Sequence, residues 1–226
     1  MVIFLIIHNC AIELIPQEIR NHPIILKASQ KRAKNPSKML LDRAVHGKAM
    51  EKIAFANQRG RPDILHSTFQ QITFSSLYKQ KRLCVYVHLR DNWIFKLPFD
   101  WRPPANYNRF IPLFEQLLIN GQIPVKGSPL IKLEQLSLSA LVARLNTSNV
   151  YYLTSHAPKS YSLREIGLKI VNSVKPVLLI GGFQTGFKKP NSNWESIALS
   201  RDSLPTSIIT AKLLTTLELM LEALEQ

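Results

Sequence analysis

Cysteine is scarce in this chain: only Cys10 and Cys84 occur among its 226 residues. Neither belongs to a CxxC pair or to a His-rich segment. The sequence therefore predicts neither a disulfide framework nor a zinc site, and we expect no metal. Such a chain suits a reducing compartment, and we expect it in the cytoplasm.

Long apolar runs are also missing. No segment approaches the ~18 consecutive apolar residues that a membrane-spanning helix needs. Residues 2–7 are apolar, but no basic segment precedes them, and His8, Asn9 and Cys10 interrupt them before any cleavage-like site. We interpret this opening as a buried strand and expect no contact with a membrane.

The common catalytic motifs cannot be recognised either. The sequence shows no Ser-His-Asp or Cys-His arrangement, no pair of carboxylates at a catalytic spacing and no P-loop. Its six histidines have no ligand spacing. These features argue against the common classes of hydrolases and phosphotransferases.

Acidic residues are few, with 15 Asp and Glu against 29 Lys and Arg, which gives a net charge of +14 and a pI near 10.0. Residues 1–110 carry 18 basic and 7 acidic side chains, so +11 of this charge lies in the first half. A polyanionic partner such as nucleic acid is expected to contact mainly that half. The alternatives are a solvated surface or an anionic membrane.

Short strands alternate with helices along the chain, which is typical of a layered α/β fold. Apolar runs predict strands at residues 2–7, 150–153 and 177–180, and amphipathic spacing predicts helices at 64–72, 106–119, 162–174 and 206–224. Alternation at residues 83–89 and 93–97 predicts a β-hairpin, which we interpret as an insertion at about residues 78–100.

A glycine-rich turn follows the strand predicted at 177–180. Gly181, Gly182 and Gly186 stand where the backbone can approach a ligand closely. The spacing departs from GxGxxG, and no acidic residue follows at the distance that a dinucleotide fold requires. A nucleotide-type site and an ordinary turn both remain open.

Arginines at the boundaries of elements are candidates for RNA contacts. Asp63 lies two residues after Arg61, near enough to hold its guanidinium in one rotamer. Either this pair binds a phosphate or a base through Arg61, or it belongs to an exposed turn in which Asp63 interacts with the dipole at the start of a helix. Arg102 and Arg109 are placed to flank a phosphate, although each alone is an ordinary surface arginine.

Nine short segments stand in a characteristic order: ELIP at 13–16, NHP at 21–23, KNPS at 34–37, LLD at 40–42, GRPDILH at 60–66, NYNRF at 106–110, EQLL at 115–118, the glycines of 181–186, and LS at 199–200. In this order they resemble the SPOUT-class pseudouridine N1-methyltransferases of ribosome biogenesis, particularly the shorter archaeal form. The resemblance covers nearly the whole chain.

This resemblance implies one SPOUT domain over residues 1–226, with helices on both faces of an α/β sheet. It also implies a deep trefoil knot within about residues 150–226, an exception among unknotted chains, whose loops hold S-adenosylmethionine. The residues that match the cofactor-binding segments are Leu153, Gly181, Gly186, Phe187, Lys188, Leu199, Ser200, Arg201, Asp202, Ser203 and Leu204. Lys188 and the lysine after it depart from the residues expected behind the glycine loop.

Contacts with small-subunit rRNA are implied for Arg61, Arg102 and Arg109, with Asp63 bracing Arg61. Asp63 is also the carboxylate that we expect to be able to accept a proton. Ala105 stands where many members of the family carry an arginine. One of the contacts with the RNA phosphates is therefore missing or is made by another residue. The family further implies a homodimer with RNA across both subunits.

The sequence therefore predicts methylation of N1 of a pseudouridine in small-subunit rRNA, in small ribosomal subunit biogenesis. Positioning of the two substrates is expected to supply much of the acceleration. Two alternatives stay open, namely a non-catalytic assembly factor that binds pre-rRNA, and a SPOUT methyltransferase that acts on tRNA.

Overall fold

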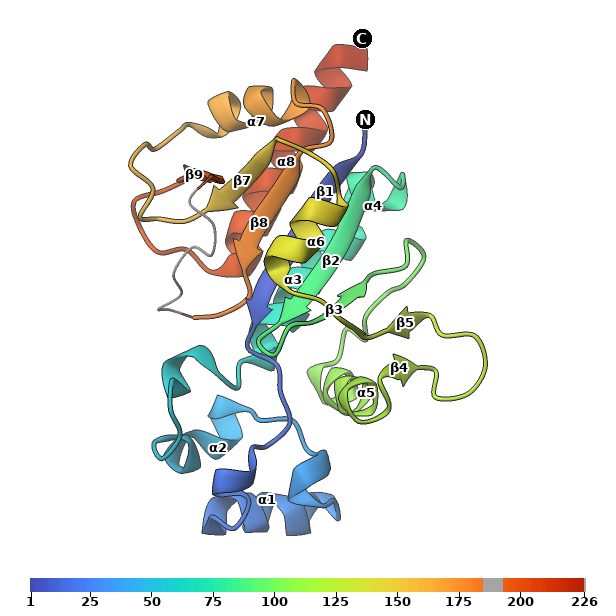
Figure 1. The fold of residues 1–226 in the computed structure, drawn as a ribbon, viewed down its shortest axis with the longest axis vertical. Helices are drawn as coiled ribbons and strands as arrows, with labels where there is room; N and C mark the ends of the chain where they lie inside the picture. Colours follow the sequence, from blue (N-terminus) through green and yellow to red (C-terminus); the bar gives the residue numbers. More distant parts are fainter. Residues whose placement is uncertain (185–192, 226) are drawn as a thin grey trace.

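The computed structural model describes residues 1–184 and 193–225. A seven-stranded sheet lies at the centre of the fold (Figure 1). The strands β2, β1, β8, β7 and β9 are parallel to one another, whereas β3 and β6 extend the sheet beyond β2 through antiparallel pairs. In spatial order the strands are β6 (Glu134–Gln135), β3 (Trp93–Lys96), β2 (Leu83–Leu89), β1 (Ile3–Cys10), β8 (Val177–Gly181), β7 (Val150–Leu153) and β9 (Glu195–Ile197).

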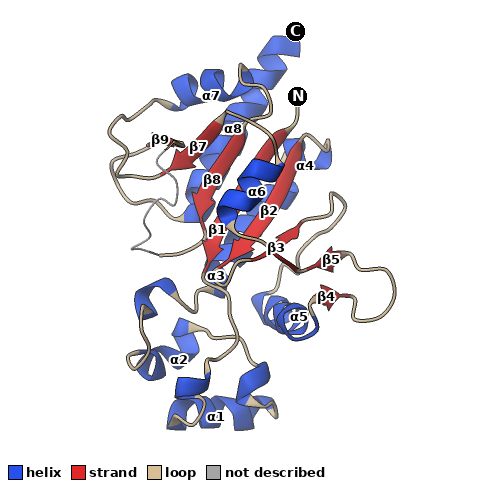
Figure 2. Cartoon of the chain, in the orientation of Figure 1, coloured by secondary structure: helices blue, strands red, loops and turns tan. Residues whose placement is uncertain are grey.

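Helices cover both faces of this sheet, as predicted (Figure 2). Alternate residues of a strand point to opposite faces. Leu5 of β1 therefore joins the core beneath α3 (Pro62–Phe74), α7 (Leu163–Val171) and α8 (Thr206–Glu225). Ile6 faces the opposite core, which α6 (Leu138–Arg144) covers.

The predicted hairpin is present as β2 and β3, which pair antiparallel. Its first strand also pairs in parallel with β1 from Leu83 to Leu89. The hairpin is therefore an integral part of the central sheet. The short α4 (Ser76–Lys79) leads into it from the end of α3.

The last helix, predicted at residues 206–224, buries four of the five leucines that follow its helical spacing. Leu213, Leu214, Leu217 and Leu221 are buried, but Leu224 is 65% exposed. The C-terminal end of α8 extends past the sheet, where no layer covers it (Figure 1).

The basic N-terminal segment forms a helical lobe with a core of its own. It contains α1 (Pro23–Arg32), α2 (Arg43–Met50) and the 3-10 turns Gln17–Ile19, Pro36–Lys38 and Ala56–Gln58. His22 caps α1 and Pro23 occupies its first turn, which fixes where this helix begins. Eight side chains fill the core of this lobe: Ile15, Ile19, Ile25, Met39, Leu41, Ala49, Met50 and Ile53.

Beside this lobe lies α5 (Tyr107–Asn120), followed by the small antiparallel pair of β4 (Gln122–Ile123) and β5 (Ile131–Lys132) (Figure 1). Asn106 caps α5 through its side chain, which accepts a hydrogen bond from the Asn108 amide at 2.8 Å.

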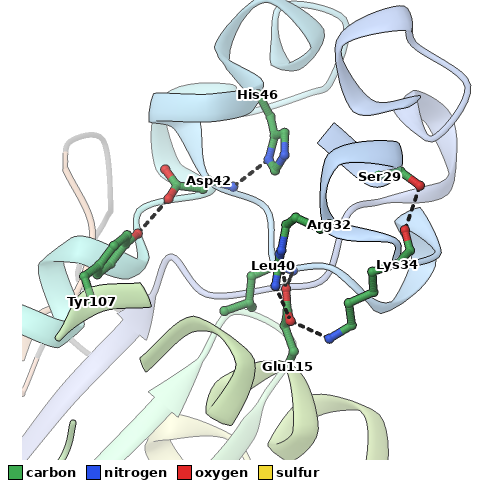
Figure 3. Close-up of polar contacts among 8 residues, drawn as sticks. All are labelled: Ser29, Arg32, Lys34, Leu40, Asp42, His46, Tyr107 and Glu115. Atoms are coloured by element: carbon green, nitrogen blue, oxygen red, sulfur yellow. Dashed lines mark hydrogen bonds and ion pairs between the residues drawn. The ribbon is translucent and has the colours of Figure 1, made fainter. Parts of the chain in front are cut away.

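A buried carboxylate joins the helical lobe to α5. Glu115 is fully buried, and its two oxygens accept hydrogen bonds from Arg32 at 2.7 and 2.9 Å (Figure 3). Lys34 donates at 2.5 Å and the Leu40 amide at 2.9 Å. Burial alone would raise the Glu115 pKa, but these hydrogen bonds outweigh it and lower the pKa below its ordinary value of 4.5. Glu115 is therefore ionised and fully paired.

Among the described residues, no helix combines the length and the apolar character that crossing a membrane requires.

Glu115→Gln is expected to lower the free energy of unfolding by about 2 kcal/mol at pH 7, because Arg32 and Lys34 lose their buried partner. A carboxylate with a lowered pKa stabilises the fold above its ordinary value of 4.5, and this contribution is lost as the pH falls through the folded-state pKa. Urea unfolding between pH 7 and pH 3 should therefore show a weaker pH dependence in the variant.

Glu134→Gln is the matched control, because Glu134 pairs with Arg144 through two hydrogen bonds on the surface. An exposed pair contributes little to stability. An unfolding midpoint unchanged by Glu115→Gln at pH 7 would contradict the role of the buried carboxylate.

Candidate functional site

A cavity of about 420 Å³ opens where β7 and β8 end. Ligands of open α/β sheets bind at this carboxyl edge of parallel strands. Leu153 and Gly181 supply the strand ends, and Thr206 and Ile209 supply the first turn of α8. The Thr206 hydroxyl donates to the Gly181 carbonyl at 2.7 Å, which fixes α8 against the end of β8.

Most of the residues predicted to bind the cofactor line this one cavity, although they come from three separate segments. These residues are Leu153, Gly181, Leu199, Ser200, Arg201, Asp202, Ser203 and Leu204. Gly186, Phe187 and Lys188 lie outside the described residues.

The 199–204 segment is held to neighbouring loops. Arg201 donates to the carbonyls of Ala157 at 3.2 Å and Pro158 at 3.5 Å. The Ser200 hydroxyl accepts from the Asp202 amide at 3.1 Å. Two further backbone pairings, Thr154 with Ile197 and Tyr161 with Ala198, fix the approach to this segment.

The two glycines at the end of β8, Gly181 and Gly182, have different structural roles. Gly181 lines the cavity, whereas Gly182 faces the core, where a Cβ would lie 2.5 Å from the Cys10 sulfur and 3.0 Å from Ile7. The Gly182 amide donates to the His8 carbonyl at 2.8 Å, and its carbonyl accepts from Ala11 at 3.0 Å. Gly182 is therefore required by close packing against β1.

Sequence reasoning missed several residues of this cavity, including Thr154, His156, Phe183, Gln184 and Ile209. The signal for the first four was their position directly after the buried strands 150–153 and 177–180. Ile209 carried no such signal, because it reaches the cavity through the placement of α8.

A second cavity of about 310 Å³ adjoins the first and contains Arg61 and Asp63. The shared wall of the two cavities consists of Phe183, Gln184, Ser203, Leu204 and Thr206. Ile64 and Ser67 of α3 line the far side of the second cavity.

Arg61 is held from three sides. Its Nε and Nη2 atoms donate to the two Asp63 oxygens at 2.8 and 2.7 Å, and its Nη1 donates to Gln184 at 2.8 Å. Its amide donates to the Ala11 carbonyl at 2.8 Å. The hydrogen bond with Asp63 raises the Arg61 pKa, so the guanidinium keeps its charge. The predicted bracing contact between the two side chains is thus present.

Gly60 sets the approach to Arg61. It has a φ of +61°, and a Cβ would lie 2.9 Å from Leu41. Its carbonyl accepts from the Arg43 amide at 2.8 Å. Pro62 then opens α3 with Asp63 in the first turn.

Arg102, Ala105 and Arg109 are exposed and do not line either cavity. They lie on the loop and first turn that lead into α5. This segment packs on α3, because His66 hydrogen-bonds the Pro104 carbonyl at 2.9 Å and its ring lies 4.8 Å from that of Phe110. Neither arginine has an ion-pair partner in the part of the chain that the structure describes.

Tyr107 connects this segment with the helical lobe, a contact that sequence reasoning missed. Its hydroxyl donates to Asp42 at 2.7 Å (Figure 3). Asp42 also caps α2 by accepting from the Ala44 amide. Burial and this hydrogen bond raise the Tyr107 pKa well above its ordinary value of 10.0. The hydroxyl therefore stays protonated as a donor.

No group of His, Cys, Asp and Glu side chains within residues 1–184 and 193–225 is arranged to hold a metal ion.

Comparisons with known proteins agree over most of the chain. Residues 5–218 match the family described as EMG1/NEP1 methyltransferase. A "Ribosomal RNA small subunit methyltransferase Nep1" from Pyrobaculum aerophilum is 38% identical over 182 residues, which cover 80% of each protein. The protein of the same name from Thermococcus kodakarensis is 31% identical over 95% of this chain and 96% of its own.

A solved structure shows the same fold. The Nep1 of Archaeoglobus fulgidus, crystallised with bound S-adenosylhomocysteine, superposes with a TM-score of 0.84. The match covers 98% of this chain and 100% of that one at 26% identity.

Gly182→Ala is expected to destabilise the fold by about 1–3 kcal/mol, because the added methyl group overlaps Cys10 and Ile7. Thermal unfolding measures this cost. Gly47→Ala is the control, since Gly47 lies within α2 with open space around its Cβ position. That variant should be neutral or slightly more stable. Equal stability losses in both variants would show that packing at Gly182 is not the reason for this glycine.

Proposed function

Because this chain belongs to the EMG1/NEP1 methyltransferase family, we propose that it methylates small-subunit rRNA with S-adenosylmethionine, at N1 of a pseudouridine. The shared wall of the two cavities supports this function most directly. A methyl donor in the larger cavity and a nucleotide held by Arg61 in the smaller one would face each other across that wall.

The larger cavity fits the cofactor. Its volume of about 420 Å³ lies in the range of small-ligand pockets, about 300–1,000 Å³. Leu153, Ile180 and Leu199 offer apolar walls for an aromatic base, and Ser200 and Asp202 offer polar groups. When bound, S-adenosylmethionine supplies a methyl group on a positively charged sulfur.

The chain's own residues have the task of orientation. Transfer requires the acceptor nitrogen to approach in line, so holding the two substrates in place supplies much of the acceleration. Arg61 presents a fixed positive charge in the smaller cavity, and Gln184 connects it to the cofactor side. The target nucleotide leaves its stack to enter, as sequence-specific RNA recognition commonly requires.

Asp63 serves primarily to brace Arg61. Both of its oxygens already accept hydrogen bonds from the guanidinium, which favours a stable ionised pair. It is nevertheless the one carboxylate that lines the smaller cavity among the described residues. The N1 proton leaves to Asp63 or to water.

Arg102 and Arg109 are assigned to the phosphates on either side of the target nucleotide. Both lie on the segment that His66 and Tyr107 fix to α3 and α2. Ala105 between them contributes no charge, so this surface holds the RNA with fewer arginines than many relatives.

We also propose that residues 150–226, approximately, form a trefoil knot and that the protein is a twofold homodimer. Both rest on membership of the family rather than on a contact within this chain. Sedimentation at micromolar concentration should give the mass of two chains. A monomer under these conditions would remove the dimer from the proposal.

Asp63→Asn should lower methyl transfer to a small-subunit rRNA hairpin by about 100-fold or more, because Arg61 loses its fixed orientation. Cofactor affinity, measured by isothermal titration, should change little, since Asp63 does not line the larger cavity. Glu134→Gln is the control, because it removes a similar paired carboxylate outside both cavities. A folded Asp63→Asn protein with lost cofactor affinity would contradict this division of labour.

A further inference from the structure

A third cavity of about 380 Å³ lies at the ends of β1 and β2, and it shares no lining residue with the two cavities described above. Its walls come from the β1 end, the β2–β3 turn, the N-terminal side of α6, and the segment that leads to Arg61. The lining side chains that matter here are Asn9, Phe55, Arg90 and Asn92.

Phe55 presents an aromatic ring to solvent in a fixed place. Its side chain is 66% exposed, and its φ of 55° is rare for a bulky residue. Arg59 holds the segment by pairing with both Glu13 oxygens and by donating to the Ala54 carbonyl at 3.5 Å. A strained and pinned conformation of this kind is typical of functional positions.

His88 orients an amide in the opposite wall. The backbone amide of Asn9 donates to His88 Nδ1 at 3.3 Å, so Nδ1 is an acceptor and the neutral ring carries its proton on Nε2. That Nε2 donates to the side-chain oxygen of Asn92, Oδ1, at 3.1 Å. Burial lowers the His88 pKa, which keeps the ring neutral at pH 7. With its oxygen occupied, the Asn92 side chain keeps its NH₂ group as a donor for a ligand.

Arg90 adds a positive charge, and it has no ion-pair partner among the residues that the structure describes. No Asp or Glu lines the described part of this cavity. An aromatic face, an oriented amide donor and an unpaired arginine are together the groups that bind an unstacked nucleotide of RNA. A protein segment would leave the arginine without a partner unless it were acidic.

We propose that this cavity binds one unpaired nucleotide of the rRNA outside the target, with its base on Phe55 and its phosphate beside Arg90. The inference rests on the proposed function, because it takes rRNA as the ligand. Arg61 lies six positions after Phe55, so their Cα atoms are at most about 21 Å apart. One RNA strand can therefore contact both sites.

Phe55→Leu tests the stacking contact, because leucine keeps an apolar side chain without the aromatic face. The probe is a small-subunit rRNA hairpin with single-stranded extensions on both sides, and the readout is its Kd by fluorescence anisotropy. We expect binding to weaken about 5- to 100-fold, the range for loss of one base stacked on an aromatic ring. Phe74→Leu is the control, since Phe74 is 59% exposed and lines none of the three cavities.

Arg90→Gln tests the phosphate contact independently. The slope of log Kd against log salt concentration should fall by about 1, whereas Arg164→Gln on α7 should leave it unchanged. An unaltered Kd in Phe55→Leu together with an unaltered slope in Arg90→Gln would overturn the proposal. Unaltered RNA affinity with altered sedimentation would also overturn it, and would identify a second copy of the chain as the occupant.

Methyl transfer by the wild-type protein to the same RNA distinguishes a failure of the third RNA site from a failure of the proposed methyltransferase function. If the wild type transfers methyl groups and the Phe55 and Arg90 variants bind normally, only the third site is wrong. If the wild type binds cofactor and RNA without transfer, the proposed function itself is wrong.

Discussion

The guanidinium of Arg61 is the group on which the candidate site depends. Asp63 fixes its orientation with two hydrogen bonds, and Gln184 connects it to the wall of the larger cavity. An unbraced arginine would sample many rotamers and lose side-chain entropy whenever it bound a ligand. Here this ordering is completed during folding, so the positive charge of Arg61 already has a fixed position in the folded protein.

Two remote contacts hold the segment that carries Arg102 and Arg109 in a fixed position relative to Arg61. The buried Glu115 binds Arg32, Lys34 and the Leu40 amide, which fixes the helical lobe against α5 (Figure 3). Asp42 links the start of α2 to the start of α5 through Tyr107. The segment that carries Arg102 and Arg109 is therefore tied to both the lobe and α3, although neither arginine enters a cavity.

Local sequence patterns predicted the elements well where local forces decide them. The strand 150–153 and the start of the last helix at Thr206 agree with the structure, because an unbroken apolar run and a helical period identify them. The pairing of Arg61 with Asp63 was also predictable, since the two residues are only two positions apart in the sequence. By contrast, β6, β9 and α6 were missed because they are short and owe their structure to the sheet that they join.

Long-range contacts could not be predicted from the residues. Glu115 accepts a hydrogen bond from Arg32, which is 83 positions away in the sequence. Arg61 donates one to Gln184, which is 123 positions away. In the sequence, Gly182 belongs to a glycine-rich turn that was a candidate ligand loop. In the structure a glycine is needed there because a side chain would overlap Cys10 in the neighbouring strand β1. The cofactor assignment itself needed the family resemblance, because a glycine pair after a strand is consistent with an ordinary turn.

We propose that the two adjoining cavities bring a methyl donor to a pseudouridine. Mass spectrometry of a small-subunit rRNA hairpin, made with either uridine or pseudouridine at the target and incubated with protein and labelled S-adenosylmethionine, tests it directly. We expect one added methyl group on the pseudouridine hairpin and none on the uridine hairpin. Methylation of the uridine hairpin, or of neither RNA by protein that binds both cofactor and RNA, would contradict it.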